Sequence, residues 1–253
     1  MATLKTRGIV LKRRSQGEAD RVVTVLAPRL GKFSAIAKGA RRITSRLGGH
    51  LELFSVVDFV LTEGRTWYIV SAAETVTTFP VLRTSLPAAQ AAGHFVRLIN
   101  RFIPEGEDAP LAYDRLEQAL AALPETPSSL VLRQFEWQLL LLGGLQPELR
   151  QCSHCGSALD PIQLGLCPTR GGALCPNCQT SEAVHLPVSA DTVKVLRLFE
   201  RSPATFASRL TVSPRVEQEL ERVTKAFIEH ALETPLDAPL TLSVSAEMTH
   251  AHR

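Results

Sequence analysis

Residues 51–72 read LELFSVVDFVLTEGRTWYIVSA, and this stretch gives the clearest indication of the fold of the N-terminal third of the chain. Two runs rich in β-branched and aromatic residues, Leu51–Thr62 and Thr66–Ala72, lie on either side of Glu63-Gly64, which is the pattern of a β-hairpin. Turn residues also separate three earlier runs of the same kind, at Leu4–Leu11, Arg21–Leu26 and Gly31–Lys38. Five short strands at this spacing predict a small closed β-barrel.

After about residue 80 the apolar residues recur with a helical period. Prolines and glycines divide this part into five predicted helices, at Ala88–Ile103, Leu111–Leu123, Ser128–Leu142, Ala190–Glu200 and Pro214–Ala231. The chain is therefore predicted to be an α+β protein. Its expected domains are a barrel over 1–80, helices over 81–149, a cysteine module over 150–182, and further helices with a C-terminal tail over 183–253. The tail is expected to fray from about Ala246.

Charge is distributed unevenly along the chain, although the net charge is only +3. Residues 1–80 contain 13 Lys or Arg against 6 acidic residues, a net +7, which leaves −4 for the remainder. A polyanion partner would be attracted to the N-terminal part. The alternative is a basic face that only keeps the domain soluble.

The basic residues are densest in Arg29–Arg46, which contains no acidic residue and two glycines. A loop of this kind can follow a phosphate backbone closely. The predicted phosphate contacts are Lys32, Lys38, Arg41, Arg42 and Arg46, with Arg13 and Arg14 on a neighbouring segment. Aromatic residues that could stack on bases are better explained as barrel core; they are Phe33, Phe54, Trp67 and Tyr68.

Two C-x-x-C pairs, Cys152/Cys155 and Cys175/Cys178, are separated by 19 residues. This spacing is typical of a four-cysteine zinc site, because two thiolates three residues apart on a tight turn can face one tetrahedral ion. We expect one structural zinc ion with no coordination position left for water. The alternatives are four metal-free thiols or a redox pair. Cys167 has no partner at the required spacing and is expected to be a free thiol.

Catalytic motifs are not found in the sequence. His50-Leu51-Glu52 matches half of the zinc deaminase signature, but neither cysteine pair is preceded by the required proline. Phosphate-binding glycine loops, a nucleophile elbow and a zinc protease motif are all missing. No apolar run is long enough to span a membrane, and no secretory signal is recognised. The expectation is a cytoplasmic protein that is not an enzyme.

Two sets of motifs resemble the RecO family of bacterial recombination mediators. The N-terminal set is Gly8-Ile9-Val10-Leu11, Gly17-Glu18-Ala19-Asp20, Val23-Thr24-Val25-Leu26, Gly31-Lys32, Ala37–Arg42 and Ser45-Arg46-Leu47. The second set is Phe135-Glu136-Trp137, Leu139-Leu140, Leu142–Leu145, Pro147-Glu148-Leu149 and Cys152–Gly156. One departure is Gln16, where the family usually has an aromatic residue.

The resemblance implies an N-terminal oligonucleotide-binding (OB) barrel and a helical domain with an inserted zinc module. It also implies a protein that binds single- and double-stranded DNA and anneals complementary strands without hydrolysing ATP. The implied partners are RecR and single-strand-binding protein, with RecA assisted indirectly, and the implied location is the bacterial cytoplasm near the nucleoid. An alternative function is that of an adaptor, whose helical domain recruits proteins while the basic face only assists.

Overall fold

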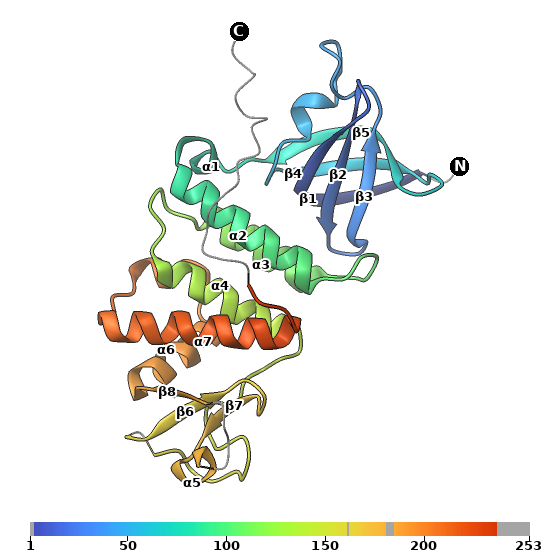
Figure 1. Cartoon of the computed structure of the whole chain (residues 1–253). Coiled ribbons are helices and arrows are strands. Elements are labelled where there is room, and N and C mark those ends of the chain that lie inside the picture. The colour runs from blue at the N-terminus through green and yellow to red at the C-terminus, as the bar shows by residue number, and fades with distance from the viewer. Residues whose placement is uncertain (1–2, 161, 181–184, 237–253) are drawn as a thin grey trace.

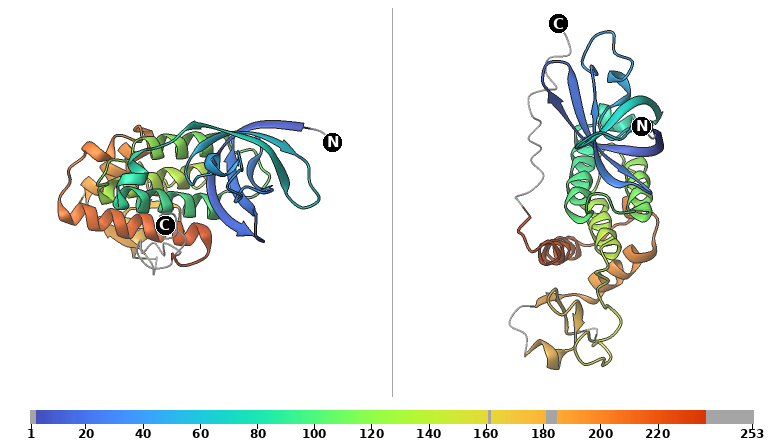
Figure 2. Two further views of the ribbon diagram at one scale, coloured as in Figure 1. Left: turned by 90° about the horizontal axis from the view of Figure 1, so that it is seen from above. Right: turned by 90° about the vertical axis from the view of Figure 1, so that its right-hand side faces the viewer.

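The computed structural model describes residues 3–160, 162–180 and 185–236. A β-barrel, a layer of helices and a small cysteine-containing module follow one another along the long axis of the molecule (Figure 1), and the right-hand view of Figure 2 shows the same order. The expected fraying from Ala246 lies outside the described residues. Among the described residues, no helix combines the length and apolar character needed to cross a membrane.

The N-terminal part is a closed five-stranded barrel, as predicted. Its strands are β1 (Thr3–Gln16), β2 (Asp20–Ala27), β3 (Gly31–Ala37), β4 (Val56–Thr62) and β5 (Tyr68–Thr77). They close in the order β1-β2-β3-β5-β4, with β3 and β5 parallel and the other described pairs antiparallel. This is an OB-like barrel.

Three strands differ from their predicted bounds by more than one residue: β1, β4 and β5, of which β5 covers Tyr68–Thr77 and not Thr66–Ala72. β1 continues to Gln16, past a β-bulge between Val10 and Lys12, which bends the strand so that it can pair with both β2 and β4. β4 begins at Val56 and not at Leu51. Leu51 is nevertheless fully buried in the barrel core, which explains why its apolar character resembled that of a strand.

The helices follow the predicted periodicity. They are α1 (Val81–Thr84), α2 (Leu86–Phe102), α3 (Pro110–Ala121), α4 (Ser129–Leu142), α6 (Ala190–Arg201) and α7 (Pro214–Leu232), with short 3₁₀ turns η1 (Gly48–His50) and η2 (Ala207–Arg209). α4 lies in the middle and contacts α2, α3, α6 and α7. The short helix α1 was not predicted. Leu111 was expected on the apolar face of α3, but its side chain is exposed, because Ala112 and Tyr113 face the core instead.

The cysteine module contains more regular structure than its sequence indicated, and it extends past the predicted end at residue 182, because β6 pairs with a strand that ends at Val188. It comprises β6 (Leu164–Cys167), β7 (Gly172–Leu174), the single helical turn α5 (Pro176–Gln179) and β8 (Leu186–Val188). The three strands form an antiparallel sheet in the order β7-β6-β8. Leu164, Leu166 and Ala173 belong to the main apolar core together with the helices. The module is therefore packed onto the helical layer.

The barrel is docked on the helices by apolar and polar contacts. Ile9, Leu11 and Leu26 belong to the same buried cluster as α2 and α4. Lys32, on the outer side of β3, is buried, and its Nζ donates to the carbonyl oxygen of Asn100 at 2.6 Å. Burial lowers the pKa of this lysine. The predicted phosphate contact of Lys32 does not fit this position, because its ammonium group lies in the interface between barrel and helices.

Gly31 lies at the closest approach of these two parts. Its φ is +59°, and a Cβ placed there would lie 1.8 Å from the Glu107 carbonyl oxygen. Gly17 shares the same φ, but a Cβ there would meet nothing within 4 Å. Both positions suit glycine because L-amino acids are strained at positive φ. A substitution at Gly17 would therefore cause backbone strain alone, whereas the same substitution at Gly31 would cause backbone strain and a steric clash.

We expect Gly31→Ala to destabilise the chain by about 1–3 kcal/mol more than Gly17→Ala, because only the first adds a steric clash to the backbone strain. Urea unfolding of the two full-length variants measures this difference. Equal losses of stability would show that the barrel can shift away from the Glu107 backbone without cost.

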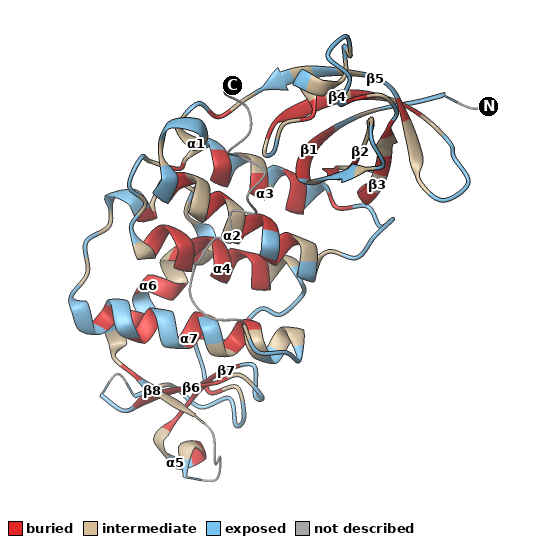
Figure 3. Ribbon diagram, turned by 45° about the horizontal axis from the view of Figure 1, so that its top comes forward, coloured by how far each residue is buried: buried red, intermediate tan, exposed pale blue. Residues whose placement is uncertain are grey.

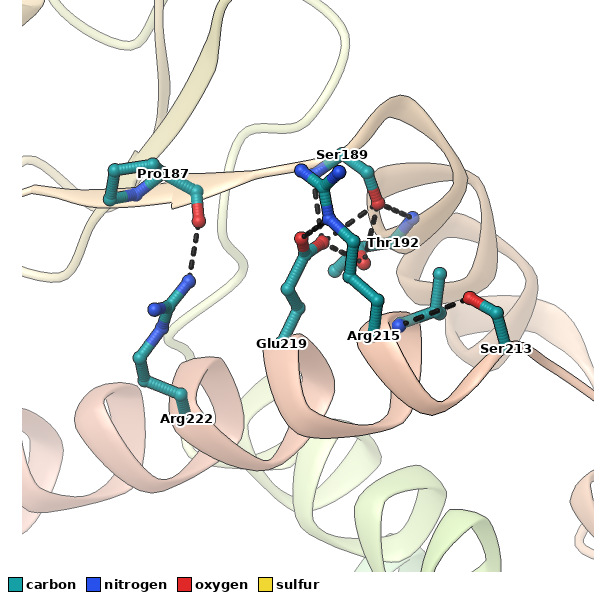
Figure 4. A network of polar contacts seen from close by, with 8 residues as sticks. Pro187, Ser189, Thr192, Ser213, Arg215, Glu219 and Arg222 are labelled. Carbon is teal, nitrogen blue, oxygen red and sulfur yellow. Dashed lines mark hydrogen bonds and ion pairs between the residues drawn. The ribbon is translucent and has the colours of Figure 1, made fainter.

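A polar network joins the cysteine module, α6 and α7. Figure 4 shows Glu219 on α7 facing the N-terminal end of α6. Its Oε2 accepts hydrogen bonds from the backbone N–H and hydroxyl of Ser189 and from the Thr192 hydroxyl, all at 2.6–2.7 Å. Arg215 donates to the other carboxylate oxygen at 2.8 Å. Arg222 also donates to the carbonyl oxygen of Pro187 in β8, so α7 holds the chain where it leaves the module.

The pKa of Glu219 falls to about 2: burial opposes ionisation, but the hydrogen bonds from Ser189, Thr192 and Arg215 outweigh it. A depressed folded-state pKa stabilises the fold above the unfolded-state value of 4.5, and this stabilisation is lost as the pH falls toward 2. We expect Glu219→Gln to cost about 3 kcal/mol at pH 7 and to remove this part of the pH dependence. Urea unfolding between pH 7 and pH 3 tests it, with the exposed Glu221→Gln as the control. Parallel pH profiles of wild type and Glu219→Gln would contradict the assignment.

Candidate nucleic-acid interface and metal centre

The loop between β3 and η1 projects from one end of the barrel, beside the turn between β1 and β2 (Figure 1). Three hydrogen bonds join the two segments. Gly39 N donates to Asp20 Oδ1 at 2.7 Å, while Arg41 donates from its backbone N to the Ala19 carbonyl at 2.9 Å and from its guanidinium to the Gly17 carbonyl at 3.2 Å. The Asp20 carboxylate thus fixes the start of the loop by accepting a hydrogen bond from the backbone amide of Gly39.

Internal contacts also fix the shape of this loop. Ala40 is buried in the barrel core, and a Cβ on Gly48 would lie 2.5 Å from the Ala40 carbonyl oxygen. Arg42 N donates to the Gly39 carbonyl, and Ser45 N donates to the Arg42 carbonyl. The loop is therefore folded back at both of its ends, and its outer residues are exposed (Figure 3).

Four of the predicted phosphate-binding residues lie exposed on or beside this loop: Lys38, Arg41, Arg42 and Arg46. Arg14 is also exposed, on β1; its guanidinium donates to Gln16 Oε1 at 2.7 Å and lies 5.2 Å from the centre of the Trp67 ring. These five cations gather at one end of the barrel. A surface of this kind suits a polyanion.

Arg13 has a different environment from Arg14, because successive side chains of a strand point to opposite faces. Its guanidinium forms an ion pair with Glu52 at 2.6 Å and is only 27% exposed. The aromatic candidates are mainly structural: Phe33 is buried, with Tyr68 packed edge-on against it at 5.4 Å. Trp67 is half-buried beside Arg14.

An open groove of about 1120 Å³ lies next to the basic loop and extends the surface beyond the predicted residues. Arg46 and Leu47 line one side of it, and Lys5 and Arg7 of β1 line another. Arg7 is paired with Asp58 through two hydrogen bonds of 2.7 and 2.8 Å. Lys5 was not singled out from the sequence, since its position beside the loop depends on the closure of β1 onto β4.

The His50-Leu51-Glu52 segment has structural contacts. Thr75 N donates to His50 Nδ1 at 3.2 Å, and Glu52 pairs with Arg13. Both polar side chains therefore hold the barrel together near the groove. Neither of them is among the residues that cluster with the cysteines.

The four cysteines Cys152, Cys155, Cys175 and Cys178 come together in the module. Their Sγ atoms all lie within 4.8 Å of one another. Cys155 Sγ and Cys175 Sγ are 3.8 Å apart, too far for a disulfide and close to the roughly 3.8 Å edge of a tetrahedron with metal–sulfur bonds of about 2.3 Å. Cys167 is buried in the same apolar cluster but is not part of the quartet. The quartet has the geometry to hold one metal ion.

The environment of the thiols also favours a cation. Burial opposes ionisation of Cys152, but backbone hydrogen bonds at Cys175, Cys155 and His154 outweigh it and lower the pKa. A hydrogen bond from Ser157, with further support from the Cys178 backbone, lowers the pKa of Cys175 to about 6. Burial and the neighbouring thiols raise the pKa of Cys178 to about 12. A metal ion between the sulfur atoms would stabilise the thiolate forms of the cysteines that hold it.

The chain combines a five-stranded barrel that has a basic end with a layer of helices and a four-cysteine module. This is the architecture of a barrel-bearing protein whose basic end suits a polyanion. Residues 1–79 match the family model described as "Recombination protein O N terminal", and residues 83–238 match "Recombination protein O C terminal". The chain belongs to the RecO family.

Individual relatives cover nearly the whole chain. The protein named DNA repair protein RecO from Roseiflexus sp. (strain RS-1) is 36% identical over 230 residues, which cover 90% of this chain and 81% of the relative. Proteins of the same name from Dehalococcoides mccartyi (strain BAV1) and Desulforamulus reducens are 34% and 35% identical, with 90% or more of both chains covered. The family relationship therefore applies to barrel, helices and cysteine module together.

Proposed function

We propose that this chain is a non-enzymatic DNA-binding mediator of recombinational repair. It binds single- and double-stranded DNA at the basic end of the barrel and anneals complementary strands. It also helps RecA load onto single strands coated with single-strand-binding protein, in cooperation with RecR, in the bacterial cytoplasm at the nucleoid. The observation that carries the proposal is the ordered, acid-free loop whose four exposed cations lie beside Arg14.

The phosphate contacts are assigned to Arg14, Lys38, Arg41, Arg42 and Arg46. Arg41 is held by Gly17 and Ala19, so its guanidinium is presented by a fixed backbone. Arg13 contributes less, because its ion pair with Glu52 already neutralises it. Lys32 is excluded by its hydrogen bond to Asn100. Contacts of this type give affinity that depends on salt and not on base sequence.

The proposed metal is zinc, with one ion per chain, which the four cysteines hold in a structural role. Four thiolates complete a tetrahedral shell, so no ligand position is available for a reacting water. The module lies at the far end of the helices from the barrel (Figure 2). Zinc therefore orders the module and the start of α6, while DNA is bound elsewhere.

Strand annealing tests the proposed function. Two complementary oligonucleotides with a donor and an acceptor dye, each coated with single-strand-binding protein, are mixed with the full-length chain without ATP. The proposal predicts faster annealing than in the absence of the chain, and that this acceleration is lost as salt is raised. The full chain is required, because helices cover the outer side of the barrel at Ile9, Leu11 and Leu26.

An adaptor function also has a structural basis. A second pocket of about 330 Å³ is formed by the segment that connects α6 to α7, and it is lined by Pro203, Thr205, Phe206, Arg209 and Leu210. Apolar walls beside a cation suit an apolar peptide end that carries a carboxylate. Binding of a labelled acidic peptide with an apolar carboxyl end, measured by anisotropy, tests this role separately from DNA binding.

A further inference from the structure

Ile43 is an isoleucine placed entirely in solvent at the outer end of the basic loop. Its relative exposure is 105%, the highest among the exposed large apolar residues of the described chain. It directly follows Arg41 and Arg42 in the sequence, and Arg46 comes three residues later. An apolar side chain is thus surrounded in sequence by the cations proposed to hold phosphates.

The loop presents Ile43 in a defined position. Arg41 and Gly39 are fixed on the β1–β2 turn, and the hydrogen bond from Ser45 N to the Arg42 carbonyl closes a turn around residue 43. Isoleucine is branched at Cβ and has few side-chain rotamers, so it loses little freedom when it is inserted into a partner. The geometry therefore combines a stiff apolar tip with a restrained backbone.

We propose that Ile43 is a wedge that inserts between neighbouring bases of DNA held by the basic loop, and that it unstacks them. Apolar wedges flanked by cations are known to open base steps in this way, with the cations holding the backbone on either side. This inference rests on the proposed DNA binding and deepens it: an unstacked base is free to pair with a second strand, so the wedge links binding to annealing.

Nucleic acid fits this surface better than a lipid membrane. Binding to a bilayer surface increases with the apolar area that is inserted, and the neighbouring loop residues Arg42, Thr44 and Ser45 are polar. One isoleucine supplies little area for a bilayer, but it is sufficient to fill a single base step. The cations at this end of the barrel also suit the negative charges of a phosphate backbone.

The test uses full-length protein and a duplex that contains 2-aminopurine beside a T-A step, which is easily unstacked. 2-Aminopurine is dim when stacked and bright when unstacked. At saturating protein we expect a rise in fluorescence of about twofold or more for wild type and for Ile43→Leu, and the loss of most of this rise for Ile43→Ala. The salt slope of binding should be unchanged in both variants, because no phosphate contact is removed. The matched control is Ile162→Ala, which removes an isoleucine 87% exposed in the cysteine module and should behave as wild type.

The possible outcomes distinguish a failure of the wedge from a failure of the proposed DNA binding. Wild type that binds DNA without brightening 2-aminopurine, or Ile43→Ala that brightens it as wild type does, overturns the wedge and leaves DNA binding intact. Absence of DNA binding by wild type overturns both the wedge and the proposed DNA-binding function. Flotation with vesicles that contain anionic lipid tests the membrane alternative. If Ile43→Ala loses vesicle binding while 2-aminopurine fluorescence is unchanged, Ile43 contacts a membrane and is not a wedge.

Discussion

The double variant Arg41→Ala/Arg42→Ala is expected to lose salt-dependent affinity for every DNA sequence alike. The slope of log affinity against log salt should become shallower by about 1.4 for single strands and about 1.8 for duplex, because each lost phosphate contact removes about 0.7 or 0.9. Both side chains are exposed, and although the Arg41 guanidinium loses its hydrogen bond to the Gly17 carbonyl, the backbone hydrogen bonds of Gly39 and Arg41 remain, so the loop should stay folded. Fluorescence anisotropy of a labelled oligonucleotide at several salt concentrations measures the change.

The matched control for this variant is Lys194→Ala/Lys225→Ala, which removes two exposed cations from α6 and α7. It has the same net charge as the test variant but leaves the barrel unchanged. An unaltered slope in a folded Arg41→Ala/Arg42→Ala protein would place the DNA site on another part of the chain. Equal changes of slope in the test and control variants would show that the effect depends only on the overall net charge.

The variant Cys175→Ser is expected to lose its zinc and to unfold the segment 150–182, because metal binding and folding of such a segment are coupled. Leu164, Leu166 and Ala173 would be exposed with it, and we expect a loss of several kcal/mol in stability, as structural zinc contributes on the order of 10 kcal/mol. Hydrogen exchange should increase in the module and at the start of α6, while binding of DNA to the barrel remains near that of wild type.

Metal analysis of the purified protein accompanies this experiment. Wild type and Cys167→Ala should each contain one zinc ion per chain, because Cys167 lies outside the quartet, and Cys175→Ser should contain none. Wild-type protein without metal, or a Cys175→Ser variant as stable as wild type, would contradict the role assigned to the cysteines.

Local patterns in the sequence predicted most of the barrel and helices. The hairpin between β4 and β5 and the helix α4 were recognised because turn residues and periodicity are local signals. The parallel pairing of β3 with β5 was not predicted, since it joins segments about 30 residues apart in sequence without a local signature. Leu51 was misassigned to a strand for a related reason: it fills the barrel core from a loop.

The same difference between local and long-range signals applies to the candidate site. The four cysteines were predicted correctly as a cluster, because their spacing is a local property. The burial of Lys32 could not be predicted, because it depends on where the end of α2 places the Asn100 carbonyl. Arg13 and Arg14 are adjacent in sequence, yet the alternation of the strand gives one an acidic partner and leaves the other exposed.

We propose that five exposed cations at one end of the barrel hold a phosphate backbone. Anisotropy of a labelled single-stranded oligonucleotide bound to the full-length wild-type chain, titrated with salt, tests it most directly. Five contacts of about 0.7 each predict a slope of log affinity against log salt near −3.5, and a steeper slope, near −4.5, for duplex. Binding with a slope near zero, or no binding at low salt, would contradict the account.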